Sequence, residues 1–514
     1  MTSALTILTT LPIAGALTTI TLGSRNKTTP RWIALAFSLA TLALTLILWH
    51  TFDPTSTAMQ FQQRHLWIAP LNIEYRTGID GLSLLMLLLS AIVTPIAIVA
   101  SWHISDRTNL YFALILLLQS CLFGTFTTLN FIPFFLFWEL SLIPAFFLIH
   151  LWGGPNRPRA ATQFLVYTMV GSIAMLLTFL ALFLATHTFD LTDLATLAQH
   201  NQLLPAVFAK LASPHITTNH IALLLFAGAF LGFAVKVPLF PFHTWLPSAY
   251  AEAPTGATIL LTGAMSKMGL YGLLRILLPI FAPQMQSVLT PLLWLSLASI
   301  LFSAYAALAQ TDLKRIFAYS SINHLGYCLL AIFAIAKSTN PTLLPEKYAA
   351  MNGLFLQTFN HALTAATLFL FIALLERRSN GLRSLDDFGG LRKAIPIFTG
   401  LMGIALFSSL GLPGLNGFPG EFLLFKGTFP LTPAFTSLAT LGLLITAIFI
   451  LGILQRVFSG PLNPTWSTMP DLTTYERLAL APLIILIFAL GLYPQLILRT
   501  INTTAMHLIQ TISN

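Results

Sequence analysis

The sequence has few charged residues and almost no cysteine. Only 8% of its 514 residues are Asp, Glu, Lys or Arg, whereas a soluble protein carries about 25%. Because 56% of the residues are hydrophobic, a soluble domain could not cover its surface with polar side chains. Cys121 and Cys328 are the two cysteines, both in apolar stretches, and they imply neither a disulfide framework nor a metal site. The composition excludes secreted disulfide scaffolds, disordered proteins and nucleic-acid-binding proteins.

The excess of positive charge forms no run along the chain. The 25 Lys and Arg exceed the 16 Asp and Glu, for a formal net charge of +9, and they are spread over loops. This distribution is typical of membrane orientation, in which Lys and Arg collect on the inner side. No charged region precedes the first apolar stretch, so we predict that this stretch is a spanning helix and not a cleaved signal.

Long apolar stretches fill the chain. A bilayer-spanning helix needs about 20 mostly apolar residues, and fourteen stretches meet this condition, which predicts an all-α polytopic membrane protein. The connections leave no room for an extramembrane domain that could hold a nucleotide, a flavin or an iron–sulfur cluster. The predicted spans are 3–23, 32–52, 80–102, 110–127, 129–151, 164–187, 220–247, 256–278, 286–309, 316–338, 349–375, 395–428, 431–455 and 479–500.

The loop charges predict the orientation of the chain. If the 24–31 loop, which begins its charges with Arg25, faces the inside, then fifteen Lys and Arg lie in inner loops and six in outer ones. This asymmetry follows the positive-inside rule. Both termini are then expected on the outer side, which is the periplasm in a bacterium.

Two predicted spans are too long and contain helix-breaking residues. The span 220–247 carries Pro238 and Pro241, and the span 395–428 carries the run LPGLNGFPGE at 412–421. Proline removes a backbone donor and clashes with the preceding turn, and unwound backbone inside a membrane is tolerated only against protein or water. Such a pair of broken helices, the seventh and the twelfth, predicts an inverted-repeat transporter core.

The spacing of ionisable residues also predicts a repeat. Glu139 precedes Lys236 by 97 residues, and His324 precedes Glu421 by the same 97, so both members are offset by 185. This offset spans five helices, and an odd number inverts the second unit. The predicted division is an N-terminal three-helix segment, a first five-helix repeat, a second inverted repeat, and a C-terminal helix with its tail: 1–109, 110–278, 286–457 and 458–514.

Six ionisable residues lie deep within the predicted spans. Each such group costs roughly 2.5–3.5 kcal/mol at the bilayer centre, so together they are expected to face one another or a hydrated interior. A proton relay through them is the functional hypothesis, with His243 in the broken seventh span as a further member. The six residues are Glu139, Lys236, Lys267, His324, His361 and Glu421.

Each of these residues also has a structural explanation. Glu139 and Lys267 could form buried ion pairs that fix packing, and the histidines could bond across helices in the core. Lys236 could extend to an interface, although it lies about 16 residues into its span. Glu421 could cap the restarted twelfth helix, because an acid is favourable near a helix N-terminus.

Five motifs in order resemble one known family, over about residues 75 to 460. They are FWELSLIP at 137–144 with WGG at 152–154, KVP…HTWLP…EAPT at 236–255, QTDLKR…AYSSINH at 310–324, Q…NH at 357–361, and LP…F.GEF at 412–422. Together they resemble the antiporter-like subunits of respiratory complex I, NADH–quinone oxidoreductase, and among these its chain M, the mitochondrial chain 4 type. One departure is Ser248-Ala249-Tyr250, where the family often has Asp-Ala-His, so Tyr250 is assigned no role.

The resemblance implies a function as well as a fold. The fold would have fourteen helices and two inverted five-helix repeats. The function would be proton translocation coupled to quinone reduction, performed as a subunit of a translocating NADH:quinone oxidoreductase. The relay would use the six residues named above. NADH, FMN, iron–sulfur clusters and quinone would be held by partner subunits, with no cofactor, metal or redox centre in this chain. Its partners would be other membrane-arm subunits, especially sister antiporter-like chains, together with membrane lipids, and no nucleic acid. Its place would be the inner membrane of a bacterium.

Two alternatives remain open at this point. The corresponding large subunit of a multisubunit sodium/proton antiporter shares the same core and would have only small membrane subunits as partners. A structural subunit that carries other subunits without pumping is a different class of protein. Proton flux per electron in a Lys236→Ala complex would distinguish a pumping subunit from a structural one.

Overall fold

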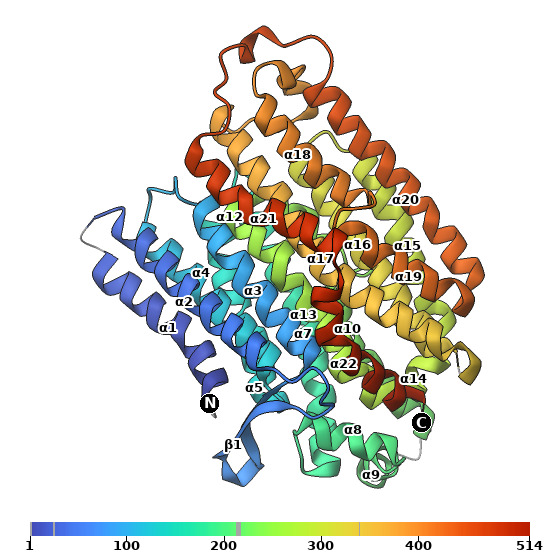
Figure 1. Cartoon of the computed structure of the whole chain (residues 1–514). Coiled ribbons are helices and arrows are strands. Elements are labelled where there is room, and N and C mark those ends of the chain that lie inside the picture. Colours follow the sequence, from blue (N-terminus) through green and yellow to red (C-terminus); the bar gives the residue numbers. More distant parts are fainter. Residues whose placement is uncertain (1–2, 24–25, 212–216, 339, 514) are drawn as a thin grey trace.

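The computed structural model describes residues 3–23, 26–211, 217–338 and 340–513. Within these ranges the chain is a bundle of long helices, most of them tilted alongside one another (Figure 1). Thirteen helical stretches of the described residues are long and apolar enough to cross a membrane. The shorter helices α18 and α19 together occupy the predicted twelfth span. The prediction of an all-α polytopic protein with about fourteen spans is therefore confirmed, whereas Arg25 lies outside the described residues.

The N-terminal segment contains three spans and a small sheet. The strands pair antiparallel, with Arg64 opposite Arg76, and Arg76 extends to Asp190 at 2.6 Å. The 53–79 connection is therefore partly a hairpin, which the weak alternation of its residues did not predict. The elements are α1 (Ala4–Leu22), α2 (Thr29–Thr51), β1 (Gln60–Ile68), β2 (Ile73–Ile79) and α3 (Gly81–Ala100).

The middle of the chain contains the first broken span and two short outer helices. π-helical turns at Leu261–Met265 and Leu273–Leu277 interrupt the eighth span. The elements are α4 (Thr108–Thr127), α5 (Phe131–Leu140), α6 (Leu142–Trp152), α7 (Arg157–Thr186), α8 (Leu191–Gln199), α9 (Leu203–Leu211), α10 (Thr218–Lys236), α11 (Trp245–Glu252), α12 (Thr255–Leu260), α13 (Ser266–Gly272) and α14 (Leu278–Ser287).

The last part contains the second broken span and an amphipathic helix. α22 follows the last span and packs on α3, α14 and α17, where the sequence predicted only a tail. The elements are α15 (Leu289–Leu308), α16 (Leu313–Lys337), α17 (Leu344–Arg378), α18 (Pro396–Ser409), α19 (Gly417–Leu431), α20 (Pro433–Ile453), α21 (Thr474–Leu492) and α22 (Gln495–Ser513).

The interior of the bundle is built around α17. The most apolar window of α17 is entirely buried by the rest of the chain, whereas the corresponding windows of α2 and α21 are mostly exposed. A helix covered on all sides by protein can carry polar residues that lipid would not tolerate. The start of α1 and the end of α22 lie at the same end of the bundle, beside the hairpin, α8 and α9 (Figure 1), as an even number of spans requires.

Both predicted helix breaks are present. α10 ends at Lys236 and the chain restarts as α11 at Trp245, while α18 ends at Ser409 and α19 begins at Gly417. A third interruption was not predicted. The fifth span divides at Ser141, two residues after Glu139, into α5 and α6.

Candidate functional site

Lys236 is the last residue of α10 and is only 2% exposed. Its ammonium donates to Ser141 Oγ at 3.4 Å and lies 4.9 Å from the centre of the Trp138 ring. The end of a helix carries partial negative charge, and an aromatic face attracts a cation. Three neutral features therefore hold a buried cation at the break, where Pro238 prevents α10 from continuing.

Glu139 lies between the two residues that contact Lys236. It is half-buried on α5, and its Oε1 has no hydrogen-bond partner among the described residues. Glu139 and Lys236 interact electrostatically, but no direct ion pair joins them in the described part of the chain. The predicted pairing is therefore a shared site with an indirect contact.

His243 lies in the unwound segment between α10 and α11. Its ring packs against Phe240 and Phe302, with ring centres 5.5 and 5.3 Å away. Within the described ranges its Nδ1 has no hydrogen-bond partner. The structure thus places His243 in the broken span but brings it to none of the other six residues.

Lys267 follows the first π-helical turn of the eighth span and is fully buried. Its ammonium donates to the backbone oxygen of Thr262 at 2.5 Å and to Ser266 Oγ at 3.3 Å, and lies 3.0 Å from Nδ1 of His361 on α17. π-helical turns recur at functional sites, and here the turn ends directly before the segment that carries the lysine. Lys267 thereby connects the first half of the chain with the second.

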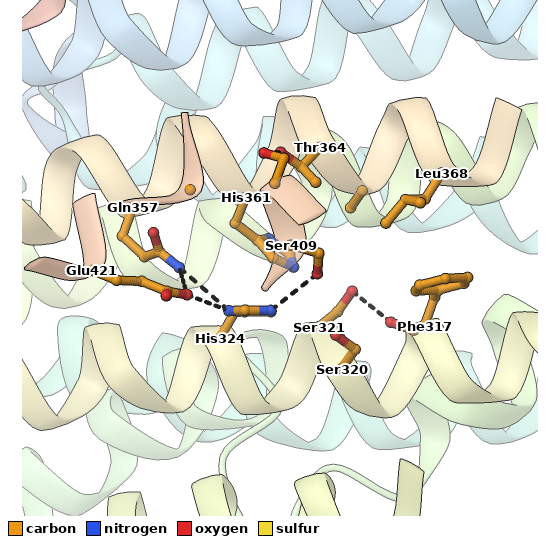
Figure 2. A pocket seen from close by; sticks show the side chains of 13 residues that line it. Phe317, Ser320, Ser321, His324, Gln357, His361, Thr364, Leu368, Ser409 and Glu421 are labelled. Carbon is orange, nitrogen blue, oxygen red and sulfur yellow. Dashed lines mark hydrogen bonds and ion pairs between the residues drawn. The ribbon is translucent and has the colours of Figure 1, made fainter. Parts of the chain in front are cut away.

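Beyond His361, the polar contacts continue to Glu421 (Figure 2). The rings of His361 and His324 have centres 5.2 Å apart, and His324 Nδ1 lies 3.0 Å from Glu421 Oε1. On the other side of the ring, His324 Nε2 lies 3.4 Å from Ser409 Oγ. Lys267, His361, His324 and Glu421 therefore form one buried row across α13, α17, α16 and α19.

A small cavity opens beside this row. It measures about 20 Å³ and is lined by His324, His361, Ser409 and Glu421, among others. A space of this size holds about one water molecule. The two histidine rings thus share a polar space.

The break between α18 and α19 is closed by side-chain amides. Asn360 donates to the backbone oxygen of Asn416 at 2.5 Å, and Asn416 donates to the backbone oxygen of Asn360 at 3.1 Å. Ser408 and Thr364 donate to the side-chain oxygen of Asn416. These bonds satisfy backbone groups that an unwound segment exposes.

Glycine at position 411 gives the carboxylate its space. Gly411 has a φ of +80°, which favours glycine, and a Cβ there would lie 2.6 Å from Glu421 Oε2. Glu421 itself lies in the second turn of α19 and not at its cap. The capping explanation for Glu421 is therefore wrong, because its side chain bonds across to α16 and α17 instead.

Two candidate positions are not joined. α10 packs against α13, yet no hydrogen bond between described residues connects Lys236 with Lys267. The contact row thus runs from Lys267 to Glu421, and Lys236 with Glu139 forms a separate site on the neighbouring helices.

The structure also brings in residues that were not selected from the sequence. Gln357 donates from Nε2 to Glu421 Oε1 at 3.0 Å and lies 3.3 Å from His324 Nδ1. It precedes His361 by four residues, so the helical period already places both on one face. Trp138 and Ser141 contact Lys236 from α5 and the α5–α6 junction, for which the sequence carried no comparable signal.

Metal-ligating side chains do not gather in the described ranges. No group of three or more His, Cys, Asp or Glu side chains there could hold a metal ion. Cys121 and Cys328 are buried free thiols.

Comparison with known proteins identifies relatives along nearly the whole chain. The family model described as "NADH:quinone oxidoreductase/Mrp antiporter, TM" matches residues 128–446. The NADH-quinone oxidoreductase subunit M of Rhodobacter capsulatus is 34% identical, covering 99% of this chain and 97% of that relative. The "F(420)H(2) dehydrogenase subunit M" of Methanosarcina mazei is 37% identical, covering 90% and 89%. A chain of respiratory complex I from Thermus thermophilus with bound NADH superposes with a TM-score of 0.83 at 26% identity, covering 99% and 100%.

The fold and the buried polar row define an antiporter-like polytopic membrane protein. The helix breaks, the lysine at the end of one broken helix and the acid after the other are its distinguishing features. Because the family model covers more than half of the chain and the relatives cover nearly all of it, the chain belongs to the NADH:quinone oxidoreductase/Mrp antiporter family. The predicted resemblance is confirmed, and the bacterial source of the Rhodobacter relative agrees with the predicted inner-membrane localisation.

Proposed function

We propose that this chain is a proton-translocating membrane-arm subunit of an NADH–quinone oxidoreductase complex. The single observation that carries the proposal is the unbroken row of contacts from Lys267 to Glu421. Ionisable side chains inside a membrane bundle are costly unless they serve a pathway. Histidine titrates near neutral pH and can take a proton at one ring nitrogen and release it at the other.

In this proposal the proton passes from Lys267 to His361, then to His324 and Glu421. The first transfer has a 3.0 Å contact, the second uses the shared cavity, and the third again has a 3.0 Å contact. Glu421 releases the proton towards the outer side. Each donor and acceptor is held on a different helix, so small helix displacements would open or close a step.

The site of Glu139 and Lys236 would control this row through charge. An ammonium held only by neutral partners responds strongly to the charge of a nearby carboxylate. A change of charge near Glu139 would alter how readily Lys236 holds its proton, and α10, which ends at Lys236, packs against α13, which carries Lys267. His243 would belong to the inner approach of this first half.

The redox chemistry would take place in other subunits. We assign no NADH, FMN, iron–sulfur or quinone site to this chain, and we propose that partner subunits hold these groups. One similar relative is a subunit of a dehydrogenase named for a different donor. The electron donor is therefore expected to be set by partners, among them sister antiporter-like chains, while this chain and its surrounding lipids serve the proton.

The domain division remains part of the proposal. Each repeat, 110–278 and 286–457, would contribute one broken helix to the translocation unit. The segments 1–109 and 458–514 would flank it. A sodium/proton antiporter subunit of the same family and a structural subunit without pumping remain the competing functions, and the same experiment separates all three.

The test is Glu421→Gln in the assembled complex, which keeps size and hydrogen bonding but cannot carry a proton. We expect normal assembly and a loss of proton pumping, measured as protons moved per electron in sealed vesicles. Glu421→Asp should retain part of the activity. Glu346→Gln, a half-buried acid in the first turn of α17, is the matched control and should pump normally.

The outcomes separate the candidates clearly. Normal pumping by Glu421→Gln, with failure of Glu421→Asp, would assign the residue to shape and contradict the relay. Quinone-dependent pumping that is absent while sodium gradients drive proton movement would identify the antiporter. Unchanged pumping in both Glu421→Gln and Lys236→Ala complexes would identify a structural subunit.

A further inference from the structure

Gln357 occupies a position that no role has yet explained. It is buried on α17 and directs its amide nitrogen at both members of the His324–Glu421 pair (Figure 2). Its Nε2 lies 3.0 Å from Glu421 Oε1 and 3.3 Å from His324 Nδ1. Within the described residues, the amide oxygen of Gln357 has no hydrogen-bond partner. The side chain thus leaves its own oxygen unsatisfied in order to present its donors.

The geometry around Glu421 Oε1 permits one assignment of hydrogens better than the others. Oε1 lies 3.0 Å from both His324 Nδ1 and Gln357 Nε2. An ionised carboxylate oxygen accepts from two donors, whereas a protonated one gives up part of that capacity. Both contacts are therefore satisfied together when Glu421 is a carboxylate and His324 carries a hydrogen on Nδ1.

That assignment leaves the other ring nitrogen available. With the hydrogen on Nδ1, His324 Nε2 carries a lone pair and faces Ser409 and the cavity shared with His361. The hydrogen bond made by one histidine nitrogen determines which nitrogen is free for chemistry. The side that faces the incoming proton is thus the side that can accept it.

We propose that Gln357 is a positioning residue that keeps the proton of neutral His324 on Nδ1, so that Nε2 receives the next proton of the relay. This inference rests on the proposed function and deepens it. A proton bonds to Nε2 while the Nδ1–H bond breaks, and the proton released from Nδ1 bonds to Glu421 Oε1, with no change of oxidation state. Gln357 then donates to the emptied Nδ1. After Glu421 has released its proton outward, the carboxylate again favours the hydrogen on Nδ1 and resets the ring.

Other titratable groups surround the pair on several elements. His361 faces it from α17 and Lys267 from α13, while Tyr327 and Cys328 lie on α16 itself. The facing residue of α18 is Ser409. None of these groups donates to Glu421 Oε1 among the described contacts, so the amide of Gln357 is the donor whose removal changes the pair directly.

The test replaces the amide without removing its volume. Gln357→Met fills nearly the same space and has no N–H donor. We expect the assembled complex to lose pumping about tenfold near neutral pH, since a hydrogen bond to a charged group is lost. The low-pH limb of the pumping profile should move to higher pH, because the carboxylate form of Glu421 loses a donor and releases its proton less readily. Gln119→Met is the matched control, since Gln119 is also buried and donates one hydrogen bond, to Thr41 at 2.9 Å.

Two further measurements decide the role. In a Glu421→Gln background, Gln357→Met should cause no additional shift of the pH profile. A wild-type profile in Gln357→Met, or an equal shift in Gln119→Met, would overturn the proposal. If Gln357→Met fails to assemble, Gln357→Glu keeps the shape and should shift the profile in the same direction, and an unchanged profile there overturns the proposal too. If Glu421→Gln pumps normally, the proposed function fails, whereas a loss of pumping in Glu421→Gln with a normal Gln357→Met profile removes only this inference.

Discussion

The two broken helices hold opposite charges by different means. Lys236 ends α10, where the helix end, the Trp138 ring and the Ser141 hydroxyl stabilise its cation. Glu421, offset by 185 residues, lies in the second turn of α19, beyond the range in which a helix terminus acts strongly. It is held instead by direct donors from His324 and Gln357. The same backbone interruption thus supports a base in one half and an acid in the other.

The difference extends to how each charge is coupled to its partner. Glu139 and Lys236 interact without direct contact, whereas His324 and Glu421 lie at hydrogen-bond distance. A charge without a direct partner responds to its surroundings, while a paired charge is set by its neighbour. The first site is therefore suited to sensing and the second to handing over a proton.

The largest expected effect comes from removing the base of the first site. Lys236→Ala should reduce proton pumping at least about tenfold, which corresponds to about 1.4 kcal/mol, with the complex assembled. Lys426→Ala, an exposed lysine on α19, should pump normally. Proton uptake by vesicles during quinone reduction measures both. Unchanged pumping in an assembled Lys236→Ala complex would remove Lys236 from the mechanism and leave the two halves without a functional counterpart.

The next effect compares the coupling within each half. A double-mutant cycle with His324→Ala and Glu421→Gln should give a coupling of about 1–3 kcal/mol in turnover, within the range seen for residues in contact. The corresponding cycle with Glu139→Gln and Lys236→Met should give a smaller but non-zero coupling. Strictly additive effects in the second cycle would show that Glu139 and Lys236 do not act together. A larger coupling in the first half than in the second would reverse the comparison.

Stability should differ between the two breaks as well. Asn416→Ala leaves backbone and side-chain groups of α17 and α18 unsatisfied, which costs about 1–3 kcal/mol for each buried group. Ser299→Ala removes one acceptor from the first break, the hydroxyl that receives the Phe240 N–H at 2.8 Å. Thermal unfolding of the purified complex should show the larger loss for Asn416→Ala. Equal losses would mean that both interruptions depend on side chains to the same degree.

The smallest effect is expected at Ser141. Its contact with Lys236 is long, at 3.4 Å, so Ser141→Ala should lower turnover only about two- to threefold, consistent with a weak neutral donor–acceptor bond. Ser172→Ala is the control, because Ser172 bonds Trp138 at 2.9 Å and not the lysine. A loss as large as that of Lys236→Ala would show that the hydroxyl, and not the helix end, dominates the site.

Much of this arrangement could be predicted because charge is so rare in the chain. An apolar span makes each buried ionisable residue conspicuous, and Pro238 and the run at 412–421 mark both breaks. The contact partners could not be predicted in the same way. Which helices lie side by side is set by packing, so the approach of Lys267 to His361 is not contained in either helix alone.

Other features lacked a sequence signal or had one that was too general. The break at Ser141 follows no proline or glycine, and the π-helical turn before Lys267 differs from an α-helix by one residue of register. β1 and β2 alternate too weakly to be distinguished from a loop. Gln357 shares a helix face with His361, yet many polar residues do so, and only its contact with Glu421 distinguishes it.

The exchange of amide bonds between Asn360 and Asn416 has a mechanical consequence. Two parts of the chain that are 56 residues apart hold each other by both backbone and side chain, so the interrupted segment cannot slide along α17 without stretching both bonds. His361 is the next residue after Asn360 and is carried by the same joint. Any push on the second broken helix is thereby delivered without slack to the histidine that faces Lys267, and the two move as parts of one lever.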